Sequence, residues 1–351
     1  MRRRPLFPCI VPTSARAACP LPARSSVDQR RPLARHRTCM RANESAPMHP
    51  LPETTHDYSV LVPCFNASTT LERALLSALA QSVPPAEIIV VDDGSSDTAA
   101  SKAIARRHAP TVRFVEQDNR GPGAARNAAA RLASSRWLAF LDADDAWLAD
   151  KMARQLRLVA GPETGLLLDS PTKNGRPAPA TPGFDDLWQL NWVRTSAAVV
   201  RREAFASVGG FEEDRALIGA EDYNLWLRLL AAGWTAAADS ASLIHYTPAA
   251  NSITRQIERC ARGELDNIDR LHAQLGMDAA RVCRKRRTIQ LAFGRDLLHH
   301  RNLRAARAML GAPARHGMPE ALLFWLATFA PTGLLDLHRK LRARRRQPSR
   351  T

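Results

Sequence analysis

The chain has 351 residues, 45% of them hydrophobic and 24% charged, which suffices for one large domain or a domain with an extension. Its formal net charge of +16 lies mostly at the ends, because residues 1–47 hold ten Arg against two acids and residues 336–351 hold seven basic residues against one acid. The nearly neutral middle excludes a basic nucleic-acid-binding core, so we expect no nucleic-acid partner, whereas the basic ends favour contact with an anionic surface such as lipid head groups.

Residues 1–56 are rich in Arg and Pro and show no sustained helical or strand period, so we expect a disordered basic tail. Two origins stay open for it. One is an Arg-rich transit peptide, and the other, slightly favoured, is a start codon placed too early, with Met40 or Met48 as the true first residue.

From residue 57 the pattern is one of strands alternating with helices. The run IIVV has no polar alternation, as in a parallel strand buried on both faces. Strands are expected within 58–66, 87–97, 112–117 and 137–145, with helices from about residue 71, at 97–108 and within 119–135. Alternation in units of this length predicts a mostly parallel α/β sheet flanked by helices.

Acidic residues follow two of these strands, namely Asp92 and Asp93 after the second and Asp142, Asp144 and Asp145 after the fourth. Ligands of open α/β sheets bind at the carboxyl ends of the strands. Three carboxylates within four positions repel one another when ionised. Two explanations fit the stretch LDADDAW: aspartates that begin a helix, or oxygen ligands for a divalent cation.

The remaining pattern predicts a helix at 148–160, a strand at 165–169, a Pro-rich loop at 170–183, a strand and helix within 195–205, a helix within 219–234 and a strand at 242–246. From about residue 255 the chain reads as helical and basic. We therefore expect a tail at 1–56, one α/β domain at 57–254 and a helical basic extension at 255–351.

The apolar segment ALLFWLATFA at 321–330 is too short to cross a bilayer, which needs about 20 residues. Followed by LHRKLRARRR at 337–346, it resembles an interfacial anchor on anionic lipid. The alternative is a helix that packs on the core, followed by a solvated tail.

The six cysteines include no CxxC pair, so a zinc site is not expected and the thiols are interpreted as free, in a reducing compartment. The reducing compartment favours a cytoplasmic protein, and the basic ends favour a peripheral place at the inner membrane face.

Six motifs lie within roughly residues 57–250: VPCFN, VVDDGSSD, NRGPGAARN, FLDADD, VGGF and AEDYNLWLRL. In their order and spacing they resemble the motifs of the family 2 inverting glycosyltransferases, which have the GT-A fold. The resemblance implies transfer of a sugar from a nucleotide-diphosphate sugar, with a UDP-sugar favoured, to a saccharide or lipid-linked acceptor. It points to the synthesis of cell-surface polysaccharide or glycolipid.

The resemblance also indicates which residues would bind the nucleotide-sugar donor. Asp92 and Asp93 match the acid pair that binds the nucleotide base, and Pro63 and Phe65 match the loop that lines it. The family more often has Tyr at the position of Phe65, so a ring remains for stacking but a hydroxyl is lost. Arg126 matches a position near the phosphates or base, with an ordinary surface arginine as the alternative.

Asp142 and Asp144 match the DxD motif, which places Asp142 near the ribose and gives Asp144 a Mg²⁺ or Mn²⁺ ion that bridges the phosphates. Asp145 is then expected to begin the following helix. Asp222 matches the catalytic base, which the chemistry requires because a sugar hydroxyl is a poor nucleophile at neutral pH. The alternative for Asp222 is a carboxylate that merely complements a helix dipole.

Two other functions stay open at this point. A nucleotidyltransferase also uses a parallel sheet, acids and Mg²⁺, but would carry a Gly-rich phosphate loop with Lys or Arg after the first strand, and VPCFNAST has none. A non-catalytic scaffold of the same fold at a membrane surface is the second.

Overall fold

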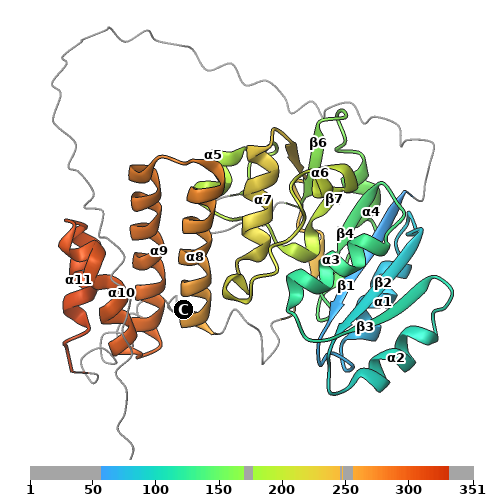
Figure 1. The fold of residues 1–351 in the computed structure, drawn as a ribbon, viewed down its shortest axis with the longest axis horizontal. Coiled ribbons are helices and arrows are strands. Elements are labelled where there is room, and N and C mark those ends of the chain that lie inside the picture. The colour runs from blue at the N-terminus through green and yellow to red at the C-terminus, as the bar shows by residue number, and fades with distance from the viewer. Residues whose placement is uncertain (1–56, 170–176, 246, 248–255, 332–351) are drawn as a thin grey trace, which may run out of the picture.

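The structure is a computed structural model, and it describes residues 57–169, 177–245, 247 and 256–331 (Figure 1). The predictions made for the tail 1–56 and for the basic segment 337–346 lie outside these residues. So does the first part of the Pro-rich loop.

The strands of the described chain are β1 Tyr58–Cys64, β2 Glu87–Asp93, β3 Val112–Gln117, β4 Trp137–Phe140, β5 Ala146–Trp147, β6 Thr164–Leu168, β7 Val199–Arg201, β8 Thr235–Ala238 and β9 Ile244–His245. The α-helices up to residue 231 are α1 Leu71–Leu79, α2 Thr98–Arg106, α3 Pro122–Leu132, α4 Lys151–Leu156, α5 Phe184–Gln189, α6 Arg202–Ser207 and α7 Glu221–Ala231. Two short 3-10 turns, η1 Thr195–Ala197 and η2 Arg215–Leu217, precede β7 and α7.

Seven strands form one sheet in the order β3-β2-β1-β4-β7-β6-β8. Strand β7 is antiparallel to both of its neighbours, and every other pairing is parallel. A separate small sheet pairs β5 with β9, antiparallel. The predicted fold class, a mostly parallel α/β sheet with flanking helices and a C-terminal helical extension, is confirmed.

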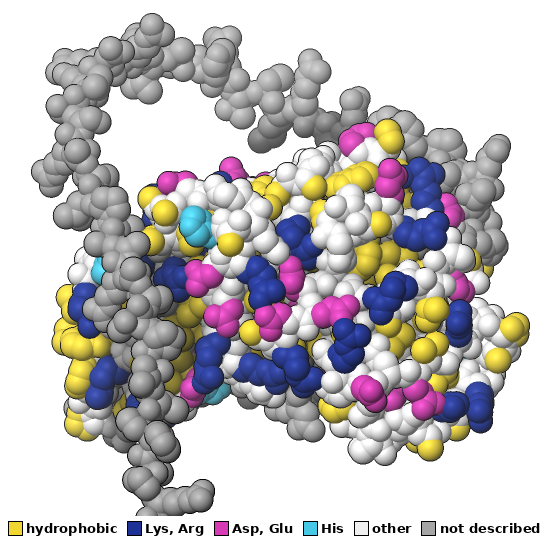
Figure 2. Space-filling model, in the orientation of Figure 1, with side chains coloured by type: hydrophobic (Ala, Val, Ile, Leu, Met, Phe, Trp, Pro, Cys, Tyr) yellow, Lys and Arg dark blue, Asp and Glu magenta, His cyan; other side chains and the backbone are white. Residues whose placement is uncertain are grey.

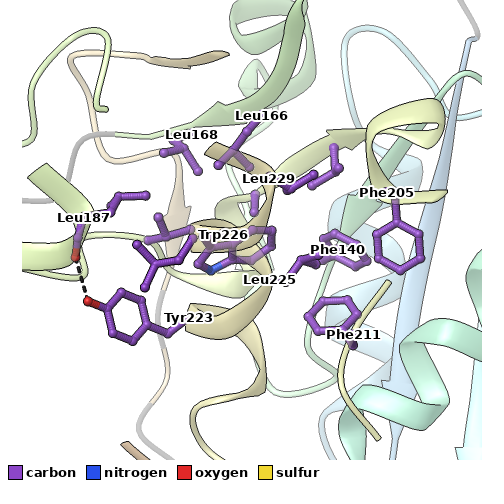
Figure 3. Packing of buried hydrophobic residues seen from close by; sticks show 14 of the residues in the cluster. Phe140, Leu166, Leu168, Leu187, Phe205, Phe211, Tyr223, Leu225, Trp226 and Leu229 are labelled. Atoms are coloured by element: carbon purple, nitrogen blue, oxygen red, sulfur yellow. Dashed lines mark hydrogen bonds between the residues drawn. The ribbon is translucent and has the colours of Figure 1, made fainter. Parts of the chain in front are cut away.

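Both faces of the sheet are covered, which is why its central strands read as unbroken apolar runs. On one face Leu61, Ile89 and Phe140 pack against residues of α3, α6 and α7. On the other face alternate residues of the same strands pack against α1, α2 and α4. Figure 3 shows the first cluster, in which Trp226 of α7 lies beside Phe140 and Phe211.

Several elements differ from the sequence prediction, and neither helix α5 nor the short strand β5 was predicted. The helix expected at 148–160 is shorter, because β5 and a turn occupy the residues before α4. Strand β8, with the sequence TAAA, was not predicted at all. Alanine has low β-propensity, and this segment becomes a strand through its pairing with β6.

The C-terminal helices are α8 Ile257–Leu275, α9 Ala279–His299, α10 Leu303–Arg315 and α11 Pro319–Ala327. They stand side by side at the end of the molecule away from β3 (Figure 1). Helices α8 and α9 contribute Ile268, Leu271, Val282 and Ile289 to the same core cluster as Phe140. Within the described residues no helix is long and apolar enough to span a bilayer.

Candidate active site

The carboxyl ends of β1, β2 and β4 lie at one edge of the sheet because these strands are parallel. Strand β7 is antiparallel, so its amino end, preceded by η1, reaches the same edge. The acids predicted to act therefore share this edge with a turn that sequence reasoning did not single out.

Asp92 and Asp93 are buried and hold the loops that follow β2 and β3. Asp92 accepts hydrogen bonds from the amide and hydroxyl of Ser95, at 3.1 and 2.6 Å, and from the hydroxyl of Thr98 at 2.7 Å. Asp93 accepts from the side chain of Gln117 and from the amides of residues 120 and 121, each at 2.8 Å. These bonds give the pair a loop-shaping role, and contact with a nucleotide base remains a prediction.

The loop after β1 presents an aromatic ring to solvent. Pro63 is half-buried, whereas Phe65 is 54% exposed. The side-chain Oδ1 of the next residue, Asn66, accepts from the backbone amide of Ser96 at 2.8 Å. The backbone amide of Asn66 donates to the hydroxyl of Ser95 at 2.9 Å. The loop with the exposed ring is thus hydrogen-bonded to the loop that follows β2 and Asp92.

The DxD loop concentrates negative charge. Burial, and next the charge of Asp142, raise the pKa of the Asp144 carboxyl above its ordinary value. The guanidinium of Arg73 donates to the backbone carbonyl of Asp144 and partly offsets this charge. Asp142 is half-buried and its Oδ1 accepts from Arg126 at 2.7 Å.

The prediction that Asp145 begins a helix is wrong. Asp145 is buried, and its Oδ2 accepts from the hydroxyl of Ser196 at 2.6 Å, while its Oδ1 accepts from the amide of Thr247 at 3.2 Å. The chain continues into β5, and the next helix begins at Lys151. Burial raises the pKa of Asp145 to about 6.

Arg126 lies buried between two carboxylates, so the alternative of an ordinary surface arginine is wrong. Besides its bond to Asp142, it donates to Oε1 of Glu221 at 3.0 Å. Burial opposes the charge of this guanidinium, but Asp142 and Glu221 outweigh burial and raise its pKa. Arg126 therefore joins the DxD loop to the first residue of α7.

Asp222 occupies the first turn of α7, next to Glu221. Its Oδ2 accepts from the hydroxyl of Thr195 at 2.7 Å and its Oδ1 from the amide of Tyr223 at 2.6 Å. Burial, and next the charge of Glu221, raise the pKa of the Asp222 carboxyl, which Thr195 and Arg126 act to lower. A carboxylate with a raised pKa is a stronger proton acceptor, as a general base requires. The Asp222 carboxylate is therefore suited to proton abstraction, and its place in the first turn also complements the dipole of α7.

Three comparisons bear on this arrangement. A model of the family described as glycosyl transferase family 2 matches residues 59–190. TuaG of Bacillus subtilis, a glycosyltransferase provisionally named for teichuronic acid biosynthesis, is 30% identical over 232 residues, which cover 61% of this chain and 89% of TuaG. The chain belongs to glycosyl transferase family 2. It is a glycosyltransferase, as the motifs predicted, and not a nucleotidyltransferase.

Another relative is the Escherichia coli UDP-Glc:alpha-D-GlcNAc-diphosphoundecaprenol beta-1,3-glucosyltransferase WfgD, 34% identical over 101 residues. This match covers 29% of the glycosyltransferase described here and 40% of WfgD. Among solved structures, the mannosyltransferase PcManGT of Pyrobaculum calidifontis, in complex with GDP-Man and Mn²⁺, superposes with a TM-score of 0.58. At 22% identity and 86% coverage of both chains, this likeness shows the shared GT-A fold.

The DxD residues of this family 2 enzyme are compatible with a divalent cation. In the described part of the chain no three His, Cys, Asp or Glu side chains form a complete set of metal ligands. Asp144, however, is a hard oxygen donor, and burial, followed by the charge of Asp142, raises its pKa. One such carboxylate suits Mg²⁺, which commonly takes one or two protein carboxylates and completes its shell with substrate phosphates and water.

Sequence reasoning missed four contributors to the glycosyltransferase site: Arg73, Thr195, Ser196 and, as the partner of Arg126, Glu221. Thr195 and Ser196 are small hydroxyl residues directly before a buried strand, and their partners are 27 and 51 residues away. Nothing local marks such bonds. The one available signal was two adjacent polar residues in a segment that is otherwise apolar.

Proposed function

We propose that the enzyme transfers a sugar, with inversion, from a nucleotide-diphosphate sugar to a hydroxyl of a saccharide or lipid-linked acceptor. One observation carries this proposal: Arg126 bridges Asp142 of the DxD loop and Glu221, the neighbour of Asp222. The donor-binding loop and the candidate base are thereby held at one edge of the sheet.

Asp222 would act as the general base. Its carboxylate takes the proton of the acceptor hydroxyl while the oxygen attacks the anomeric carbon. The bond from that carbon to the diphosphate breaks, and its electron pair leaves on the diphosphate oxygen. Attack from the face opposite the leaving group inverts the configuration. The raised pKa of Asp222 and its place in the first turn of α7 support this role.

On the donor side, Pro63 and Phe65 would line the base, Asp92 and Asp93 would face it, and Asp142 would lie near the ribose. Arg126 already contacts Asp142, so its effect on the donor would be exerted largely through that carboxylate. Asp144 would hold Mg²⁺ or Mn²⁺, which when bound offsets the negative charge of the diphosphate.

A UDP-sugar is the first donor to test and a lipid-linked saccharide the first acceptor, since the name of WfgD specifies both for that relative. Together with TuaG, named for teichuronic acid, this favours a part in the synthesis of a cell-surface polysaccharide. GDP-mannose also belongs in the donor panel because PcManGT was solved with it.

An anionic membrane surface is the second proposed partner. Helix α11 packs on α10, with Trp325 in the shared cluster, but it exposes Leu322, Leu323 and Leu326, and Phe329 directly after the helix is also exposed. Figure 2 shows hydrophobic side chains together with basic ones at this end of the molecule. From residue 279 to 330 the sequence carries ten Arg or Lys against two acids. Among them, Arg295 lies over the ring of Phe324 and Arg307 over the ring of Phe329. An apolar surface with basic residues beside it suits lipid with negative head groups.

The test of the transfer reaction combines binding with turnover. We expect one of UDP, GDP or dTDP to raise the thermal midpoint in the presence of Mn²⁺, since a ligand of the folded state stabilises it. Asp144→Ala should lose the part of this shift that depends on Mn²⁺. Asp222→Asn should keep the shift and lose turnover by about 10²- to 10⁴-fold.

The matched control is Asp150→Asn, which removes an exposed carboxylate at the N-cap of α4. Turnover of this variant should equal that of the parent. If Asp222→Asn turns over as fast as Asp150→Asn, Asp222 is not the base. If neither parent nor variants bind any of the nucleotides, the donor site is wrong, and a non-catalytic scaffold becomes the better account.

A further inference from the structure

The short 3-10 turn η1 places two buried hydroxyl side chains between the DxD loop and α7. Thr195 is 9% exposed and Ser196 is 1% exposed. The turn runs directly into β7, which pairs with β4, and the amide of Phe140 at the end of β4 donates to the carbonyl of Ala198 at 3.1 Å. The position of η1 is therefore fixed relative to the DxD residues that follow β4.

Ser196 fastens this turn to the DxD loop through three bonds. Its hydroxyl donates to Asp145 at 2.6 Å and accepts from the amide of Asp142 at 3.1 Å. Its carbonyl accepts from the indole nitrogen of Trp147 at 2.7 Å. The loop from 142 to 147 is thus held against η1 at its start, middle and end.

Thr195 extends the connection in the other direction, to α7, by donating to Oδ2 of Asp222 at 2.7 Å. The β-branch of threonine restricts rotation about χ1, so the hydroxyl is held with little freedom. A carboxylate has about four positions at which it accepts a hydrogen bond. Thr195 and the amide of Tyr223 occupy two of them, which leaves others for a proton from the acceptor.

We propose that Thr195 is a positioning residue, which fixes the Asp222 carboxylate relative to the DxD loop so that base and donor are held in one reactive geometry. The inference rests on the proposed role of Asp222 as general base. Thr195 itself exchanges no proton, since the acceptor proton goes to Asp222 and the leaving electron pair goes to the diphosphate. Misplacement of a reacting group by as little as 1 Å can lower a rate by about 10²-fold.

The test compares Thr195→Val, which keeps the shape of the side chain and removes the donor, with Thr195→Ser, which restores it. The assay is release of UDP from UDP-glucose, or of GDP from GDP-mannose, with Mn²⁺ and across pH. We expect Thr195→Val to lower kcat by about 10- to 100-fold, the range for a hydrogen bond to a charged group. The KM for the donor should not change, and Thr195→Ser should recover most of kcat.

The pH profile separates positioning from a general loss of structure. Burial, and next the charge of Glu221 on the same helix, raise the pKa of Asp222, and the Thr195 hydroxyl and Arg126 from α3 lower it. Without the hydroxyl the pKa rises, so the acidic limb of the kcat/KM profile should move to higher pH. The matched control is Thr164→Val, which removes another buried hydroxyl, 2% exposed, that accepts from the backbone amides of Ala160 and Gly161 in its own turn. Its acidic limb should not move.

A titration that needs no turnover accompanies the kinetics. The ¹³C signal of the Asp222 carboxyl, assigned by its loss in Asp222→Asn, should titrate at higher pH in Thr195→Val than in the parent. An unchanged titration, or equal kcat in Thr195→Val and Thr164→Val, would overturn the positioning role. Retention of turnover by Asp222→Asn would instead overturn the base itself, so the two failures are distinct.

Discussion

Removal of Arg126 should destabilise the fold as well as the site. The side chain of Arg126 is 6% exposed and that of its partner Glu221 is 8% exposed. Breaking a buried ion pair on one side costs about 3–5 kcal/mol, because it leaves an uncompensated buried charge. We therefore expect Arg126→Met, which keeps an apolar stem of similar length, to lower the free energy of unfolding by about 3 kcal/mol or more at pH 7.

Several features of the site bear on this magnitude. The carboxylate of Asp142 is 31% exposed and water can replace part of its lost bond, so most of the penalty falls on Glu221. The guanidinium also lies 5.4 Å from the ring centre of Phe211, an attraction of about 1 kcal/mol that methionine does not provide. Against this, no described residue accepts from the Nε of Arg126, so its removal relieves one unsatisfied donor.

Urea unfolding followed by tryptophan fluorescence would measure the loss. Arg120→Met is the matched control, because Arg120 pairs with Glu213 at 2.5 Å in an exposed setting, 58% and 30% exposed. Exposed pairs contribute about 0–1 kcal/mol. The double variant Arg126→Met with Glu221→Gln should recover much of the loss, because it removes the stranded charge. A cost for Arg126→Met no greater than that for Arg120→Met would refute this reasoning.

Further predictions concern other parts of the molecule. Phe65→Ala should weaken binding of the nucleoside diphosphate by about 1–3 kcal/mol if the ring stacks on the base, with no change in thermal midpoint; calorimetry that finds equal affinity rejects the stacking. Burial lowers the pKa of Lys151 to about 7 from 10.5 when unfolded. Between these two pKa values the native state binds fewer protons than the unfolded chain, so its free energy of unfolding should rise as the pH goes from 7 to about 10. Lys151→Met should lack this rise. Urea titrations that give the parent and Lys151→Met the same dependence on pH would contradict the prediction. The double variant Leu323→Glu with Leu326→Glu should no longer co-sediment with phosphatidylglycerol vesicles. Leu76→Glu, which changes a 50% exposed leucine on α1, should still do so. Equal binding by the parent, the double variant and Leu76→Glu would reject α11 as the contact.

The parts of the fold predicted from sequence are those with a local signal. Strands β2 and β4 are runs of consecutive buried apolar residues, and the acids that follow them lie at one edge because parallel strands end there. Asp222 was found through the resemblance of AEDYNLW to a family motif, which is also carried by a short continuous run of residues. These features depend on residues within a few positions of each other.

What the sequence did not predict depends on contacts across long separations. Asp145 was expected to begin a helix because its neighbours suit one, yet Ser196 and β9 hold it in a turn. Strand β8 has alanines where a strand pattern needs larger side chains, and only β6 makes it a strand. The burial of Arg126 is set by two carboxylates 16 and 95 residues away. Local pattern cannot contain that information.

The charge of the assembled site indicates what its donor requires. The DxD loop and the start of α7 together carry five carboxylates: Asp142, Asp144, Asp145, Glu221 and Asp222. Two guanidiniums contact this group, since Arg73 donates to the carbonyl of Asp144 and Arg126 donates to Asp142 and Glu221. The site therefore carries an excess of negative charge before a nucleotide diphosphate adds more. Like charges in a partly desolvated site repel strongly, so the diphosphate should bind weakly unless a cation accompanies it. Arg126→Met removes one of the two compensating charges. Its affinity for UDP or GDP should consequently depend more steeply on Mn²⁺ than that of the parent, and an equal dependence would mean that Arg126 is electrostatically independent of the donor.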